Sequence, residues 1–231
     1  MITVQGLSKH FGACKAVDRV SFNLRQGERV VLAGPSGSGK TTLLRLIAGL
    51  ERPDEGKIHL DGKLASQPGW VLPPHQRQMG FVFQTPALWP HLTVAQNIAF
   101  GISGLPKQQL RQRLETILEE VGLQHLAKRH PAQLSGGEAR RVALGRTLAP
   151  RPRILLCDEP LTNLDLENKT HLLALIMQAV DASEASLIYV THDPGEARKV
   201  AAPVWEMEQG CLRIEKPGTG TDEPASGDCA P

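Results

Sequence analysis

The sequence contains few cysteines, and their spacing does not form a recognisable framework. Cysteine accounts for only 4 of its 231 residues, at Cys14, Cys157, Cys211 and Cys229. No two of them have the CxxC spacing that is typical of zinc and redox sites. The scatter excludes a disulfide framework or a cysteine zinc site and indicates reduced, cytosolic thiols.

Long apolar runs are also missing. The opening segment, MITVQGLSKHF, has no apolar run of signal-peptide length. The longest stretch without Asp, Glu, Lys or Arg runs from Gln78 to Pro106, and it is interrupted by prolines, glutamines and glycines. A helix that crosses a bilayer needs about 20 predominantly apolar residues. The sequence therefore predicts a protein that is soluble by itself.

The sequence also lacks a large excess of positively or negatively charged residues. The chain has 26 Lys and Arg against 24 Asp and Glu, which gives a net charge of +2. This balance falls short of the strongly basic footprint of a nucleic-acid-binding domain, so no nucleic-acid partner is expected. Apolar residues at 41% and charged residues at 22% are ordinary globular values and predict a sizeable core.

The apolar patterns that the sequence does contain predict an α/β domain. The runs ITVQGL and VSFNL predict strands near the N-terminus, and MGFVFQ predicts another at 79–84. Asp61-Gly62 predicts the turn of a hairpin over 56–64, and VWEMEQGCLRI predicts a final hairpin. RILLCDEP and SLIYVTH are continuous apolar runs that end in polar residues, which is typical of central parallel strands covered on both faces.

Helical periodicity begins at Pro106. Apolar residues from Leu110 to Val121 follow a spacing of about 3.6 residues, and Gly122 suits the end of that helix. We therefore expect one α/β domain over residues 1–215, with an inserted helical segment at roughly 88–150. Residues 216–231 lack large apolar side chains and are expected to form a disordered tail.

A phosphate-binding loop follows the apolar run RVVLAG. The segment GPSGSGKT fits the pattern G-x-x-x-x-G-K-[ST] at every position, and it lies between a predicted strand and a predicted helix. Lys40 supplies a charge to the phosphates, and the hydroxyl of Thr41 is a ligand for Mg²⁺. The predicted nucleotide-binding residues here are Gly34, Pro35, Ser36, Gly37, Ser38, Gly39, Lys40, Thr41 and Thr42.

Four polar residues at the ends of other predicted strands complete a hydrolytic site. Asp158 is expected to hold Mg²⁺, and Glu159 is expected to polarise an attacking water as a general base. Because successive strand residues point to opposite faces, the two carboxylates should have different tasks. Gln84 offers an amide oxygen to the metal, and His192 is placed to contact the γ-phosphate or the water.

This ordered set of motifs resembles the ATP-binding cassette (ABC) ATPases. It comprises GPSGSGKTT, Gln84, LSGGE, ILLCDEP, LTNLD and His192, and the resemblance covers residues 1 to about 215. It implies an α/β P-loop NTPase core with an N-terminal antiparallel β subdomain and an inserted α-helical subdomain. It also implies an ATPase with ATP and Mg²⁺ that drives a membrane transporter. In this family, Phe11 matches the aromatic residue that stacks on adenine, although a core position in an early strand is the alternative.

The LSGGE segment resembles the family's signature, which covers the γ-phosphate held by a second cassette. By this resemblance Leu134, Ser135, Gly136, Gly137 and Glu138 act in trans, in a homodimer or a pair of different cassettes. Asp165, in LTNLD, would lie at the dimer seam. The residues alone predict that a helix begins here, since Ser135 and Glu138 have the spacing of a capping box.

The stretch FVFQTPALWPHLTVAQNIAFGI, at 81–102, resembles the corresponding segment in ATPases of bacterial binding-protein-dependent importers. The resemblance implies that the 85–102 region receives a permease subunit at the cytoplasmic face of the membrane, with a solute-binding protein as an indirect partner. The alternative is that this stretch forms the core of the helical insert. A short form without a C-terminal regulatory domain is expected. Two alternative functions stay open. One is an exporter or a lipid-extracting ATPase, and the other is a soluble cassette protein of DNA repair or translation.

Overall fold

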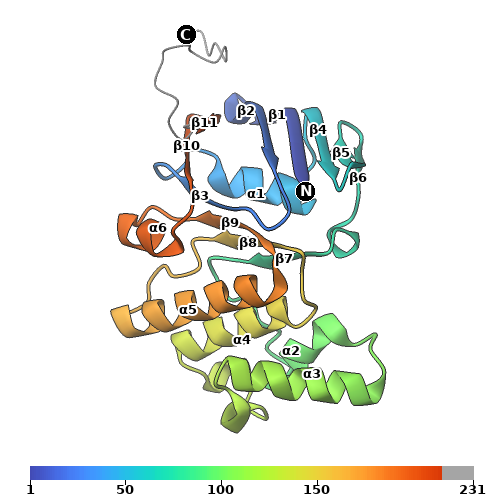
Figure 1. The fold of residues 1–231 in the computed structure, drawn as a ribbon, viewed down its shortest axis with the longest axis vertical. Helices are drawn as coiled ribbons and strands as arrows, with labels where there is room; N and C mark the ends of the chain where they lie inside the picture. Colours follow the sequence, from blue (N-terminus) through green and yellow to red (C-terminus); the bar gives the residue numbers. More distant parts are fainter. Residues whose placement is uncertain (215–231) are drawn as a thin grey trace. The chain divides into compact units, whose positions relative to one another are not determined.

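The computed structural model describes residues 1–214, which divide into two compact units. Within the described residues, the first unit comprises 1–24, 30–73 and 191–214, and the second comprises 25–29 and 74–190. The predicted tail at 216–231 lies outside the described residues. None of the helices within residues 1–214 has the length and the apolar character that crossing a membrane requires. Figure 1 shows the helices and strands with the labels used below.

An antiparallel sheet forms much of the first unit. Its strand order is β2-β1-β4-β5-β6. The strands are β1 (Ile2–Phe11), β2 (Cys14–Leu24), β4 (Glu55–Leu60), β5 (Lys63–Gln67) and β6 (Trp70–Val71). Apolar side chains on β1 and β2 are buried in register, with Ile2 opposite Leu24 and Val4 opposite Phe22. The predicted hairpin turn at Asp61 and Gly62 is present, and both residues have positive φ angles, as the tightest two-residue turns require.

The first unit also contains the strand that leads into the phosphate loop. This strand, β3 (Arg29–Ala33), pairs in parallel with β10 (Val204–Glu208), and β10 pairs in antiparallel fashion with β11 (Cys211–Ile214). After the loop the chain forms α1 (Lys40–Ala48), whose apolar residues are buried. The short helix α6 (Pro194–Val200) precedes β10.

Three parallel strands form the sheet of the second unit. They are β7 (Met79–Val82), β8 (Ile154–Asp158) and β9 (Ser186–Val190), with β8 between the other two. Every residue of β8 and β9 is buried, as the continuous apolar runs predicted.

Helices make up most of the remainder of the second unit. The α-helices are α2 (Val94–Ala99), α3 (Lys107–Glu120), α4 (Gly136–Leu148) and α5 (Leu166–Ser183). Single turns of 3₁₀-helix occur at η1 (Pro74–Gln76), η2 (Phe100–Ile102), η3 (Gln124–Leu126) and η4 (Pro131–Gln133). Helices α2, α3 and α4 lie within the predicted insert at 88–150, whose behaviour as a separate subdomain stays a prediction.

Three site residues lie beyond the strands on which the sequence pattern placed them. Gln84 follows β7 by two residues, and His192 follows β9 by two residues. Glu159 directly follows β8 with a left-handed φ of 45°. The expected alternation along one strand was therefore wrong for Asp158 and Glu159. The abrupt change in backbone direction after Asp158, rather than the pleat, separates the two carboxylates.

Gly56 provides a test of the packing of the antiparallel sheet. A Cβ atom at Gly56 would lie 2.4 Å from the carbonyl oxygen of Gly6, whereas a Cβ at Gly62 would meet nothing within 4 Å. Both residues have positive φ angles, so both substitutions introduce backbone strain. Gly56→Ala should therefore destabilise the protein by about 3 kcal/mol, and the matched control Gly62→Ala by about 1 kcal/mol. Urea unfolding measures both, and equal losses would contradict the predicted clash.

Candidate functional site

The phosphate loop in the first unit is held against neighbouring backbone. A Cβ at Gly34 would lie 2.1 Å from the carbonyl oxygen of Met207, and one at Gly39 would lie 1.9 Å from that of Ala16. Both glycines also have positive φ angles, of 144° and 105°. Only glycine fits these positions, so the shape of the loop is fixed by β2 and β10 before any nucleotide binds.

Lys40 begins helix α1 and turns back over this loop. Its side chain is 5% exposed, and its Nζ donates hydrogen bonds to the carbonyl oxygens of Gly34 at 2.9 Å and Pro35 at 2.7 Å. No side chain caps the N-terminus of α1. Ser36, Gly37 and Thr41 are exposed, whereas Ser38 is buried. The loop thus combines a buried cation with an uncapped helix start, which is the kind of place where proteins bind anions.

His192 lies beside the start of the loop. A cavity of about 720 Å³ in the first unit is lined by Gly34, Pro35 and His192, together with the N-terminal part of α6. The position of His192 within reach of the loop agrees with the predicted contact to a phosphate. Whether it makes that contact stays a prediction.

Phe11 ends strand β1 with its ring 51% exposed. The Nζ of Lys9 lies 5.4 Å from the centre of the ring. The alternative of a core phenylalanine is therefore wrong. An exposed aromatic face is what stacking on a base requires, and that role stays a prediction.

Asp158 and Glu159 occupy the carboxyl end of β8 in the second unit. Asp158 is 6% exposed, and the backbone N–H of Glu159 donates to the carbonyl oxygen of Val190 at 3.1 Å. The hydroxyl of Thr162 donates to the Glu159 carbonyl oxygen at 3.1 Å and lies 3.3 Å from its carboxylate Oε2. Arg140 donates to the carbonyl oxygen of Pro160 at 2.7 Å. The turn that carries Glu159 is thus fixed from two sides.

Sequence reasoning missed Thr162 and Arg140 as supports of this turn. The hydroxyl three residues after Glu159 was the available signal for Thr162. The contact of Arg140 depends on tertiary packing of α4 and has no local signal.

The donor types of these predicted residues suit magnesium, and a metal site shared by all of them stays a prediction. Mg²⁺ prefers oxygen ligands, and Thr41, Gln84 and Asp158 offer a hydroxyl, an amide oxygen and a carboxylate. Within the second unit, β7 and β8 are parallel neighbours with Val82 opposite Cys157. Gln84 and Asp158 therefore follow the same edge of one sheet, as a shared ligand set requires.

The signature segment begins α4, as predicted. Ser135 Oγ accepts from the N–H of Glu138 at 3.3 Å, and Glu138 Oε2 accepts from the N–H of Ser135 at 2.7 Å. This capping box lowers the pKa of Glu138, and the backbone N–H of Ser135 is the largest cause. Gly136 is exposed, and a Cβ there would meet nothing within 4 Å.

Asp165 caps the start of α5, as Ser135 caps the start of α4. Its Oδ1 accepts from the backbone N–H of Asn168 at 2.9 Å, so Asp165 is the N-cap of the helix. This bond, followed by the one from the Asn168 side chain, lowers the pKa of Asp165. Asp165 and its neighbour Leu166 are both exposed, and Leu166 is 76% exposed.

The apolar stretch at 81–102 is partly core and partly surface. Val94 and Ile98 are fully buried, but Phe83 is 42% and Phe100 is 57% exposed. Trp89 packs on Phe100 with ring centres 4.2 Å apart, and the guanidinium of Arg146 lies 4.7 Å from the centre of the Trp89 ring. The alternative of a core segment thus holds for Val94 and Ile98, and docking of a permease on the exposed residues stays a prediction. Its exposed aromatic residues remain a surface for which no partner is present.

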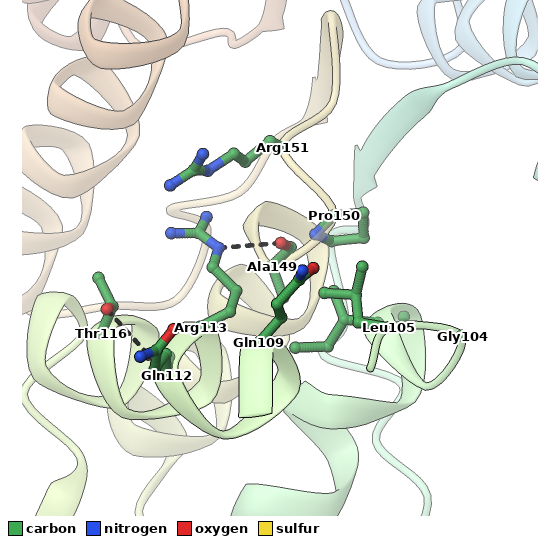
Figure 2. A pocket seen from close by; sticks show the side chains of 11 residues that line it. Gly104, Leu105, Gln109, Gln112, Arg113, Thr116, Ala149, Pro150 and Arg151 are labelled. Carbon is green, nitrogen blue, oxygen red and sulfur yellow. Dashed lines mark hydrogen bonds between the residues drawn. The ribbon is translucent and has the colours of Figure 1, made fainter. Parts of the chain in front are cut away.

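A separate cavity in the second unit contains none of the predicted site residues. It has a volume of about 540 Å³ and lies between α3 and the end of α4 (Figure 2). Arg113 points toward it and donates to the carbonyl oxygens of Leu148 at 3.0 Å and Ala149 at 3.1 Å. Arg113 thereby caps the C-terminus of α4, which gives this side chain a structural task.

Comparison with known proteins agrees with the motifs. A family model described as ABC transporter matches residues 17–162. This chain belongs to the ABC transporter family. Among ABC relatives, it is 43% identical to a sulfate/thiosulfate import ATP-binding protein CysA of Nephroselmis olivacea, over 97% of this chain and 65% of that protein. It is 45% identical to the CysA protein of Thermosynechococcus vestitus, over 97% of this chain and 67% of that protein.

Solved ABC structures share the fold. The ATP-binding cassette MJ0796, described as a dimeric post-hydrolysis state bound to ADP and Pi, matches with a TM-score of 0.83 and 31% identity, over 94% of this chain and 98% of that chain. CbiO1 from Clostridium perfringens, described as part of the ABC transporter complex cbiONQ, matches with a TM-score of 0.81 and 27% identity, over 92% and 86%. These matches confirm the predicted ABC ATPase fold. The chain spans about two thirds of the length of the CysA relatives.

The capping box leads to a prediction for pH dependence. Because the folded-state pKa of Glu138 is lowered, its stabilising contribution is present above the ordinary carboxyl pKa and is lost as the pH falls through the lowered pKa. Ser135→Ala removes the hydroxyl but keeps the backbone N–H, which is the largest cause. NMR titration of the Glu138 carboxyl should therefore still give a lowered pKa in Ser135→Ala. A return to the ordinary value would assign the effect to the hydroxyl instead.

Proposed function

We propose that this chain hydrolyses ATP as the energising subunit of a bacterial ABC importer. The observation that carries the proposal is the phosphate loop, in which Gly34 and Gly39 have no space for a Cβ atom and Lys40 begins a helix without a side-chain cap. Relatives at 43–45% identity that are named import ATP-binding proteins support import over export.

The first unit supplies the groups that bind the nucleotide. The N–H groups of the loop and Lys40 balance the charge of the phosphates, and Phe11 stacks on the adenine ring. Thr41, with Gln84 and Asp158, would hold Mg²⁺. When bound, that ion neutralises charge on the phosphate oxygens.

The second unit supplies the base for hydrolysis. Glu159 accepts a proton from the attacking water, while its carboxylate is kept in position by the hydroxyl of Thr162 at 3.3 Å. His192 contacts the γ-phosphate or the same water. Hydrolysis is then a matter of positioning and electrostatic stabilisation rather than covalent catalysis.

Two cassettes complete each site in this proposal. The segment Leu134–Glu138 of one chain covers the nucleotide of the other, and Asp165 lies at the seam. The dimeric state described for MJ0796 supports such an arrangement. ATP binding would favour the closed pair and phosphate release the open pair, as a ligand-biased two-state element.

The membrane partner would dock on the 85–102 region, around the exposed Phe100 and the half-buried Trp89. This places the chain at the cytoplasmic face of the membrane, with a permease as direct partner and a solute-binding protein as indirect partner. By the names of its relatives, the transported solute is sulfate, thiosulfate or a similar oxyanion. Transport of labelled sulfate by membranes containing this chain and its permease tests that assignment.

The assignment of the general base is tested by Glu159→Gln. This variant should bind ATP with unchanged Kd, because the loop in the first unit is intact, while kcat falls by about 10²–10⁴. Phosphate release and ATP binding to the purified chain measure the two effects. Glu167→Gln, at an exposed position on α5, is the matched control and should keep normal kcat. Near-normal hydrolysis by Glu159→Gln would remove Glu159 from this role.

Docking of the permease is tested by placing a charge on the exposed aromatic surface. Phe100→Asp should leave the ATPase activity of the isolated chain unchanged, since Phe100 is 57% exposed and is not among the residues proposed to bind or hydrolyse ATP. Transport in reconstituted membranes should fall at least tenfold, because a buried unpaired charge weakens the interface. Leu50→Asp, 40% exposed in the first unit, controls for general surface effects. Unimpaired transport by Phe100→Asp would argue against docking at this surface.

A further inference from the structure

Asn168 joins two segments that are far apart in the sequence. Its Nδ2 donates to Asp165 Oδ2 at 2.6 Å, and its Oδ1 lies 3.4 Å from the Nη1 of Arg141, on the signature helix. All three residues belong to the second unit. The side chain of Asn168 therefore bridges the start of α5 and the first turns of α4.

The same side chain explains one of the paired glycines in the signature. A Cβ at Gly137 would lie 2.8 Å from Asn168 Oδ1 and 3.1 Å from its Cγ. Rotating Asn168 away would break its bond to Asp165, so this clash cannot be relieved without loss. Gly136, by contrast, has open space at its Cβ position. A glycine at position 137 thus leaves room for the Asn168 side chain within this chain, independently of any second cassette.

The bond from the side chain is separate from the capping of α5. Asp165 caps the helix by accepting from the backbone N–H of Asn168, which any residue except proline supplies at this position. The bond from Nδ2 goes to the other carboxylate oxygen. Its removal should leave the helix capped but release Asp165 from the signature helix.

We propose that Asn168 is a positioning residue, which holds Asp165 and the signature segment as one rigid block that meets the nucleotide of the second cassette. The inference rests on the proposed function, in which both segments act in trans. Reacting groups must be held within a fraction of an ångström, and a displacement of about 1 Å can cost about 100-fold in rate. One side chain that fixes both segments would keep their spacing constant as the dimer closes.

Steady-state kinetics test this role. Asn168→Ala should lower kcat about tenfold or more while the Kd for ADP stays unchanged, because ADP binds to the loop in the first unit. Asn168→Asp keeps the shape but places a second carboxylate beside Asp165, so it should lose at least as much activity. Glu167→Ala is the matched control on the same turn. Wild-type kcat in Asn168→Ala would overturn the proposal, as would full activity in Asn168→Asp.

The contact itself is tested by a double-mutant cycle read as Tm. Gly137→Ala should lower Tm more with Asn168 in place than in the Asn168→Ala background, by about 2–4 °C. Additive changes in Tm would overturn the contact. This readout does not need catalysis. If the wild-type chain has no ATPase activity, the proposed function fails. If the wild type is active and Asn168→Ala is equally active, only the positioning role of Asn168 is contradicted.

Discussion

Close approach of the phosphate loop to neighbouring backbone is the constraint on which the proposed nucleotide site depends. Gly34 and Gly39 leave no room for a Cβ atom, because the carbonyl oxygens of Met207 and Ala16 occupy that space. The loop is therefore shaped by strands that lie far from it in the sequence. Because these contacts already order the loop, less of the binding energy of a ligand would be spent on ordering it.

Helix α4 has a comparable role in the second unit. Its first turn carries the signature, and Arg140 reaches the turn after Glu159. Near its end, Thr147 donates to the carbonyl oxygen of Phe81 at 3.3 Å, and Arg146 donates to those of Pro86 and Ala87 at 3.1 and 2.9 Å. One rigid helix therefore contacts the predicted base turn, the end of β7 and the surface proposed for the permease. A shift of α4 would therefore move groups at all three places. This helix offers a physical route between the proposed hydrolytic site and the proposed permease surface.

The parts predicted correctly from sequence are those set by local chemistry. The capping box at Ser135 and Glu138, the turn at Asp61 and Gly62, and the buried strands β8 and β9 need only a few neighbouring residues. The ABC fold followed from motif order, and the family match and the solved structures confirm it.

What could not be predicted depends on contacts between distant segments. The left-handed turn at Glu159 ended the expected strand alternation, and its supports Thr162 and Arg140 become visible only in the folded chain. Phe11 illustrates the same limit. A phenylalanine in an early strand fits a core pattern as well as a surface one, and only its observed exposure decided between them.

The predicted residues that would act on a partner's nucleotide are ordered without being deeply buried. Lys40, Ser38 and Asp158 are buried, each fixed within its own unit. Ser135, Gly136 and Asp165 are exposed, although they are ordered by helix caps. Polar groups ordered at a surface without a ligand are what a second molecule would need to find there, because their conformational entropy has already been lost in folding. The caps at Ser135 and Asp165 thus leave ordered, exposed groups that would act on a partner's nucleotide.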